Sequence, residues 1–116
     1  MKICILRCLC SLVLVFATAP LCLAADKLYV ANGSTSAIQT TTLEGGSRAT
    51  IVANYTPLAL AVDAVHSKLY WTNNDAQSRT GSVAVSSLRG TDAAVIIPSL
   101  IDPVGIAVSG DKIYYT

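Results

Sequence analysis

The chain has 116 residues, which suits one domain at most, and much of its 53% hydrophobic content lies in the first 25 residues. Eight Lys and Arg residues are balanced by seven Asp and Glu, for a formal net charge of +1. This balance argues against nucleic acid, which binds to a basic face, and against electrostatic attachment to acidic lipid.

Residues 1–24 are predicted to be a signal peptide. A short basic start is followed by uncharged apolar residues at 8–19, and Pro20 then interrupts any helix. Small residues at Cys22 and Ala24 fit a cleavage site, which we place after Ala24 or one residue later. The alternative is an uncleaved anchor, because the uncharged run is at the lower length limit for crossing a bilayer. We therefore expect a secreted or extracytoplasmic protein, with no membrane insertion of the mature chain unless the leader is retained.

The predicted mature chain, residues 25–116, contains no cysteine. All four cysteines belong to the leader: Cys4, Cys8, Cys10 and Cys22. Neither a disulfide framework nor a thiolate metal site is therefore expected in the mature chain. Its six Lys and Arg face seven Asp and Glu, so the net charge is near −1.

Three motifs recur along the mature chain, each at an interval of 41 to 46 residues. They are KLYVAN at 27–32, which returns as KLYWTN at 68–73 and KIYYT at 112–116; LEG at 43–45, which returns as LRG at 88–90; and PLALAVD at 57–63, which returns as PVGIAVS at 103–109. The varying offsets are consistent with short insertions in loops, which repeated β units tolerate. The sequence therefore contains two tandem repeats and the start of a third.

Each repeat reads as a set of short strands separated by turn residues. Runs such as 36–43, 50–55, 58–63 and 81–88 are rich in β-branched and small residues, and no segment carries a helical apolar stripe. Four short strands per unit of this length are typical of a β-propeller blade. A β-sandwich is the alternative, but it gives no reason for the three motifs to recur together. The predicted fold is all-β.

The KLYWTN segment resembles the YWTD repeat, the class B repeat of the low-density lipoprotein receptor. The similarity extends from Pro57 through LAVD at 60–63 and LRG at 88–90 to IAV at 106–108, while Asn73 replaces the aspartate that closes the family motif. The resemblance implies a fragment of a six-bladed β-propeller: two four-stranded blades plus the first strand of a third. It also implies that the position of Asn73 helps to hold adjacent blades together. The residues expected to form the structural repeat motif are Asp63, Leu69, Tyr70, Trp71, Thr72, Asn73, Gly90, Tyr114 and Tyr115.

Six blades of about 43 residues need roughly 260 residues. The predicted mature chain supplies two blades and one strand, so we expect the native protein to be longer. The alternative is that short pieces assemble a ring by oligomerising.

The resemblance implies a non-enzymatic, extracellular module that binds a protein ligand, and we predict no catalytic residue, cofactor or metal. The alternative is a fragment of an exported propeller hydrolase of the gluconolactonase or strictosidine synthase type. Those families hold a metal in the central channel with acidic and amide side chains.

A few polar residues invite a chemical interpretation. His66 follows Asp63 by three residues and could be imagined in a Ser-His-Asp triad, but the family places it in a solvated turn. Asp75 offers a hard oxygen ligand for calcium, although Asn and Asp are also common turn residues. Asn32 and Asn54 are candidate N-glycosylation sites. The aromatic residues of the motif are expected to pack between blades, and Trp71 is expected to be largely buried between strands of its own blade and the next.

Overall fold

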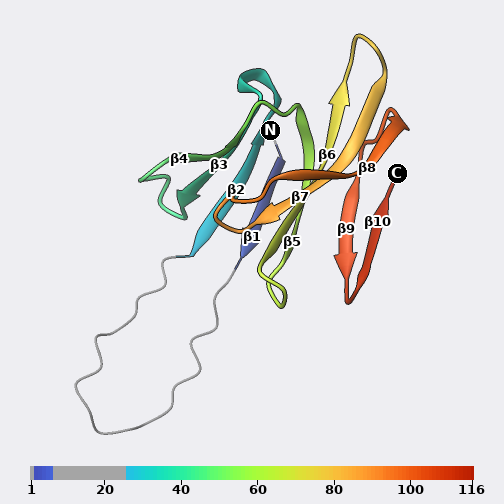
Figure 1. Ribbon diagram of the computed structural model, residues 1–116. Coiled ribbons are helices and arrows are strands. Elements are labelled where there is room, and N and C mark those ends of the chain that lie inside the picture. The colour runs from blue at the N-terminus through green and yellow to red at the C-terminus, as the bar shows by residue number, and fades with distance from the viewer. Residues whose placement is uncertain (1, 7–25) are drawn as a thin grey trace, which may run out of the picture.

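The computed structural model describes residues 2–6 and 26–116, which form antiparallel strands and a single 3-10 turn (Figure 1). From β2 onward the elements follow one another with short connections. They are β1 (Lys2–Leu6), β2 (Lys27–Asn32), η1 (Gly33–Thr35), β3 (Ala37–Thr42), β4 (Ala49–Ala53), β5 (Pro57–Asp63), β6 (Lys68–Asp75), β7 (Thr80–Ser87), β8 (Ala94–Ile101), β9 (Ile106–Ser109) and β10 (Lys112–Tyr115).

The strands form two four-stranded sheets and one two-stranded sheet. Sheet order follows chain order, β1-β2-β3-β4 in the first sheet and β5-β6-β7-β8 in the second, with β9 and β10 paired in the third. The sheets stand side by side with their faces toward one another, and the termini lie at the first and third sheets (Figure 1). The prediction of four strands per unit is confirmed for the second sheet, whereas the first sheet has four strands only with β1, which comes from the predicted leader. The third sheet has two strands where one was predicted, because residues 106–109 pair with the motif strand that follows them.

The repeat motif KLYWTN occupies β6, which pairs with β5 on one side and with β7 on the other. It pairs with β7 without interruption from Lys68 opposite Ser87 to Asp75 opposite Thr80. The β7–β8 pairing, by contrast, shifts register twice, and Pro98 lies within β8. Proline cannot donate a ladder hydrogen bond, so it is tolerated there because β8 is the outer strand of its sheet.

The hydrophobic core lies between the first two sheets. Trp71 is fully buried and forms it with Tyr29, Ile38, Val52, Leu69 and Ala84. The ring of Tyr55 meets the Trp71 indole edge-to-face, with 5.2 Å between centroids and 85° between planes. The predicted burial of Trp71 is therefore confirmed, but its neighbours differ from those expected. Alternate residues of a strand point to opposite faces, and Trp71 points to the preceding sheet and not to the following one.

Two contacts join the turn at residues 88–90 of the second sheet to the first sheet. The Tyr29 hydroxyl donates to the Leu88 carbonyl at 3.2 Å. Gly90 has a φ of +83°, and a Cβ atom built on it would fall 2.6 Å from the Ile51 carbonyl carbon of β4. Only glycine combines this backbone conformation with such a close approach. The recurring Leu-x-Gly motif is therefore an inter-sheet contact as well as a turn.

The predicted signal peptide lies outside the described residues except for Lys2–Leu6, so it stays a prediction. Those five residues form β1, which pairs with β2 from Lys2 opposite Ala31 to Leu6 opposite Lys27. Within the described ranges there is no helix with the length and apolar character needed to cross a membrane.

Candidate functional site

The motif strand β6 divides its side chains between two interfaces. Leu69, Trp71 and Asn73 share the face toward the first sheet, and all three are buried. Tyr70 and Thr72 lie on the opposite face, and the Thr72 hydroxyl donates to the Val104 carbonyl at 3.3 Å at the start of the third sheet. This strand therefore contacts both neighbouring sheets.

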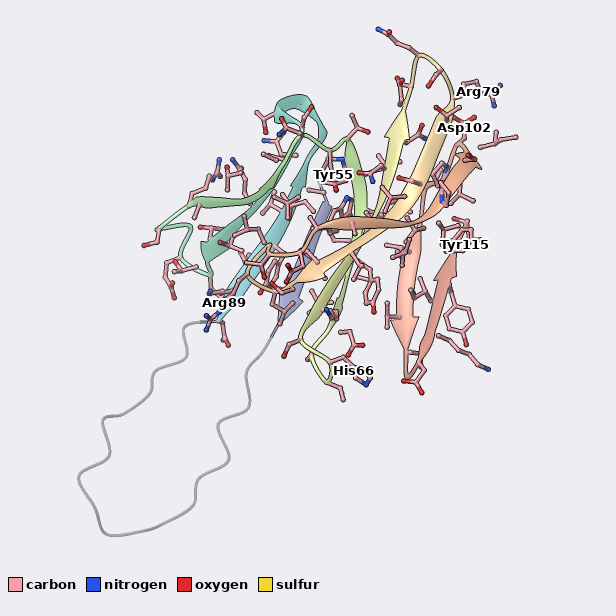
Figure 2. The ribbon with its side chains drawn as sticks, viewed as in Figure 1. Tyr55, His66, Arg79, Arg89, Asp102 and Tyr115 are labelled. Carbon is pink, nitrogen blue, oxygen red and sulfur yellow. The ribbon has the colours of Figure 1, made fainter. Side chains whose placement is uncertain are left out.

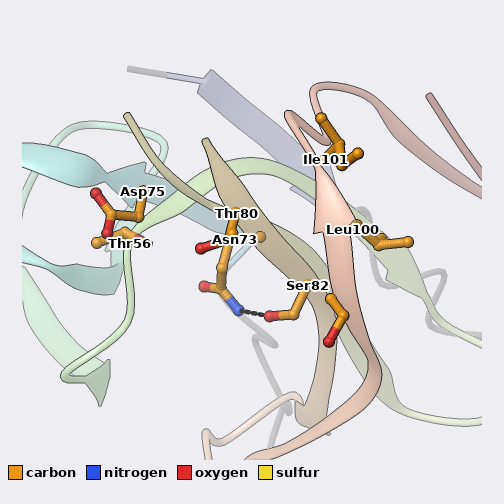
Figure 3. A pocket seen from close by; sticks show the side chains of 9 residues that line it. Thr56, Asn73, Asp75, Thr80, Ser82, Leu100 and Ile101 are labelled. Atoms are coloured by element: carbon orange, nitrogen blue, oxygen red, sulfur yellow. Dashed lines mark hydrogen bonds between the residues drawn. The ribbon is translucent and has the colours of Figure 1, made fainter. Parts of the chain in front are cut away.

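Asn73 uses both ends of its amide within its own sheet. Its Oδ1 accepts from Trp71 Nε1 at 2.9 Å, and its Nδ2 donates to Ser82 Oγ at 3.0 Å (Figure 3). An aspartate could accept both bonds but could not donate to Ser82. The expectation that this position links adjacent blades is not matched here, because both partners belong to the second sheet. Asn73 instead orients the indole that packs against the first sheet.

A groove of about 470 Å³, lined by both polar and apolar side chains, adjoins Asn73 (Figure 3). It is lined by Thr56, Asn73, Asp75, Thr80, Gly81, Ser82, Ser99, Leu100 and Ile101. Hydroxyl, amide and carboxylate groups thus converge at the end of the second sheet where β6 meets β7. The sequence did not single out Thr56, Ser82 or Ser99, because these residues become neighbours only through strand pairing.

The carboxylate of Asp75, considered as a calcium ligand, is engaged by its own turn. It accepts from the Ser78 hydroxyl at 2.8 Å and from the Gln77 N–H at 3.0 Å. These hydrogen bonds, that from Ser78 foremost, lower the pKa of Asp75 below its ordinary value of 3.8. Among the described residues, no three His, Cys, Asp or Glu side chains gather where they could hold a metal ion. Asp75 is therefore placed as a turn-forming residue.

A second cavity, of about 190 Å³, lies between the second and third sheets at the opposite end of β6. Asp63, His66 and Tyr70 line it from the second sheet, and Val108, Gly110, Asp111 and Ile113 line it from the third. His66 projects from the β5–β6 turn at the lower end of Figure 2. The predicted position of His66 in a turn is confirmed. Its side chain was expected to be solvated, but it lines this cavity.

His66 is held between two carboxylates. Its Nδ1 lies 2.7 Å from Asp63 Oδ2, and its backbone N–H donates to Asp63 Oδ1 at 3.0 Å. Its Nε2 lies 3.9 Å from Oδ1 of Asp111, in the β9–β10 turn of the third sheet. In a catalytic triad, Nε2 would accept the proton of the nucleophilic serine. In this chain the Nε2 atom of His66 faces the Asp111 carboxylate instead. Asp111 was not identified from the sequence, because nothing in the spacing places residues 66 and 111 together.

The two carboxylates shift the titration of this group. The hydrogen bond to Asp63 raises the pKa of His66 above 6.5, and the negative charge of Asp111 raises it further. The hydrogen bonds from the His66 backbone and ring lower the pKa of Asp63 below 3.8. Protonated His66 therefore stabilises the folded chain fully below about pH 6.5 and loses this effect as the pH rises through its raised pKa. The Asp63 contribution is present above about pH 3.8 and is lost as the pH falls through its lowered pKa.

We expect the melting temperature to fall between pH 6 and pH 8.5, because His66 is the only histidine in the chain. Thermal unfolding of the full chain at both pH values measures the effect. In His66→Gln the pH difference should be largely lost, and in Asp111→Asn it should be reduced. A His66→Gln chain with the same pH dependence as the original would show that another group is responsible.

The remaining predicted residues lie in varied settings. Asn54 is exposed in the β4–β5 connection with a φ of +65°, whereas Asn32 is half-buried and its Oδ1 caps η1 by accepting from the Thr35 N–H. Tyr114 and Tyr115, expected to pack between blades, are 54% and 42% exposed.

Comparison with known proteins places the fold. No family model matches the sequence, and no curated protein matches it. A solved chain in the crystal structure of a nidogen/laminin complex is similar in structure, with a TM-score of 0.54 and 14% sequence identity. The match covers 78% of this chain and 51% of that one.

The fold is that of β-propeller blades. The three sheets are thus two complete blades, β1–β4 and β5–β8, and the inner pair of strands of a third, β9–β10. The chain spans about half the length of the solved chain that it matches. At this sequence identity the similarity extends to the fold alone.

Proposed function

We propose that this chain is part of an extracellular, non-enzymatic β-propeller of the YWTD type that binds a protein ligand. The observation that carries the proposal is the exposure of three large apolar residues, at the end of β8, in the β8–β9 connection and at the end of β10. Ile101 is 81% exposed, Val104 46% and Tyr115 42%, and the Val104 N–H donates to the Thr116 carbonyl at 2.6 Å. We call these three residues the apolar rim.

The apolar rim has the composition of a binding surface. Aromatic side chains are enriched at protein interfaces, and an exposed group of large apolar residues marks a candidate contact. Asp102 follows Ile101 in the sequence and lies close to Arg79 (Figure 2), with 2.6 Å between Arg79 Nε and Asp102 Oδ2. A polar pair next to apolar side chains resembles the polar border of an interface. The structural neighbour comes from a protein complex, which supports protein binding as the class of function.

Export is the other part of the proposal, and it rests on the leader. The chain expressed in a secreting host should appear in the medium with Ala25 or Asp26 as its first residue. Retention of Met1 on a membrane-bound product would contradict export by cleavage.

Binding can be tested with the full chain immobilised on a sensor and probed with laminin and a panel of other secreted matrix proteins. At least one should bind with saturable affinity. The double variant Ile101→Ser with Tyr115→Ser should weaken that binding at least tenfold, about 1.4 kcal/mol. Val65, which is 87% exposed in the β5–β6 turn, gives the matched control Val65→Ser. Binding to none of the probes, or equal weakening by both variants, would contradict the proposal.

The propeller hydrolase remains the second candidate. The groove lined by Asn73 and Asp75 contains an amide and a carboxylate, which are the ligand types that such enzymes use. Lactone hydrolysis by the full chain with added Ca²⁺, lost in Asp75→Asn, would favour the hydrolase over the binding module.

A further inference from the structure

The groove beside Asn73 is lined by one face of the β6–β7 pair. Asn73 and Asp75 point to the same face of β6, because alternate residues of a strand share a face. Ser82 lies opposite Asn73 on β7, and Thr80 lies opposite Asp75. Figure 3 shows Asn73 between Asp75 and Ser82. Strand pairing therefore gathers a carboxylate, an amide and two hydroxyls along the groove.

The hydrogen bonds beside the groove direct their protons toward Asp75. The Ser78 hydroxyl donates to Asp75 Oδ2 at 2.8 Å. The Ser78 oxygen also lies 2.7 Å from Thr80 Oγ1, and because the single hydroxyl proton of Ser78 is directed to Asp75, Thr80 is the donor in this pair. The Thr80 oxygen is thereby left as an acceptor. The carboxylate of Asp75 keeps free lone pairs as well, because it has about four acceptor sites and each of its oxygens accepts one hydrogen bond from the turn.

The charge of Asp75 has no cationic partner among the described residues. None of the residues that line the groove is basic. Arg79 is the basic residue nearest to Asp75 in the sequence, but its guanidinium pairs with Asp102. The hydrogen bonds that lower the pKa of Asp75 keep this carboxylate ionised at neutral pH. The groove therefore offers a negative charge and several acceptors to a cation.

Aliphatic side chains of β8 complete the lining, and they distinguish between the two long cationic side chains. Ile101 lies opposite Thr80, and Leu100 lies opposite Gly81. Lysine has a four-carbon stem that packs along apolar surface and an ammonium group with three rotatable donors. Arginine binds best where two parallel acceptors are free, whereas both oxygens of Asp75 already accept a hydrogen bond. The lining therefore fits lysine better than arginine.

We propose that this groove binds a lysine side chain of the partner protein, with the ammonium group at Asp75 and Thr80 and the stem along Leu100 and Ile101. Its volume of about 470 Å³ falls within the usual range for small-ligand sites, about 300–1,000 Å³. Ile101 also belongs to the apolar rim, so one partner could contact both. This inference rests on the proposed protein binding, and it names a side chain that the partner contributes.

Nuclear magnetic resonance of the isotope-labelled full chain tests the site with Nα-acetyl-lysine methylamide as the probe. The probe should shift the Asn73 side-chain amide signal and the Thr80 and Ser82 backbone amide signals saturably. Nα-acetyl-norleucine methylamide keeps the stem but lacks the ammonium group, and it should bind at least about tenfold more weakly. The corresponding arginine compound should bind at least about threefold more weakly.

Two variants place the probe in the groove, and a third is their matched control. Asp75→Asn should weaken binding of the lysine probe at least about tenfold, because it removes the charge. Thr56→Lys should have an equal effect, because Thr56 is exposed and lines the groove, so that the chain's own ammonium group would compete with the probe. This second variant leaves the Asp75 turn intact and so guards against a local folding defect. Asp92→Asn removes the same charge from an exposed position in the β7–β8 connection, and it should change binding less than about twofold.

Absence of saturable shifts with the lysine probe would overturn the site. Equal binding of the lysine and norleucine compounds, or unchanged lysine binding in both groove variants, would also overturn it. Arginine binding as tight as that of lysine would overturn the assignment to lysine. The assay contains no partner protein, so failure here is distinguishable from failure of the proposed protein binding, which the laminin assay measures separately.

Discussion

Replacing Trp71 with alanine should destabilise the full chain by about 3–5 kcal/mol, the usual range for truncating a buried tryptophan. Trp71 is fully buried, packs edge-to-face on Tyr55 and donates its indole N–H to Asn73. Truncation would leave a cavity between the first two blades and an unpaired Asn73 Oδ1. Urea unfolding monitored by circular dichroism measures the loss.

Tyr115 supplies the matched control for Trp71. It holds the same position in the third copy of the motif, but it is 42% exposed. Tyr115→Ala should cost less than about 1 kcal/mol, as is usual for surface substitutions. Equal losses for the two variants would show that Trp71 does not have the packing role assigned to it.

Gly90→Ala should be nearly as damaging, with a loss of at least about 3 kcal/mol. A non-glycine residue in the left-handed region costs about 1–3 kcal/mol, and forcing a side chain into a packed site adds a similar amount. At Gly90 both effects apply, because the new Cβ would collide with the Ile51 backbone.

Gly45 separates the two effects. It is the counterpart of Gly90 in the first repeat and has a similar φ of +79°, but no atom lies within 4 Å of the position a Cβ would take. Gly45→Ala should therefore carry only the backbone cost. If Gly90→Ala is no less stable than Gly45→Ala, the close approach of Gly90 to Ile51 does not have the role assigned to it.

The repeats made the fold accessible from the sequence. Matching motifs in successive copies predicted the strands, and the turn at Gly90 was expected because Leu-x-Gly recurs. The direction in which each side chain points could not be read in the same way. Trp71 was expected to face the following blade, but which face of β6 meets which neighbour depends on how the sheets stack.

The candidate site was harder to predict, because its groups come together through pairing of distant segments. His66 and Asp63 are close in sequence, so their association was open to prediction, whereas Asp111 joins them only across two sheets. Ser82 reaches Asn73 because β7 lies beside β6. The inner-strand position of residues 2–6 was not anticipated, because the hydrophobicity of that region is equally typical of a leader.

The hydrogen bond from Tyr29 to Leu88 joins residues 59 positions apart, more than one repeat length. Each boundary between blades is thus built from two consecutive copies, and no single copy encodes a whole boundary. If recombination exchanged one repeat for a homologous one, one side of the boundary before it and one side of the boundary after it would change together. Duplication of the unit therefore yields a working array only while the tyrosine of one copy and the Leu-x-Gly turn of the next remain mutually compatible.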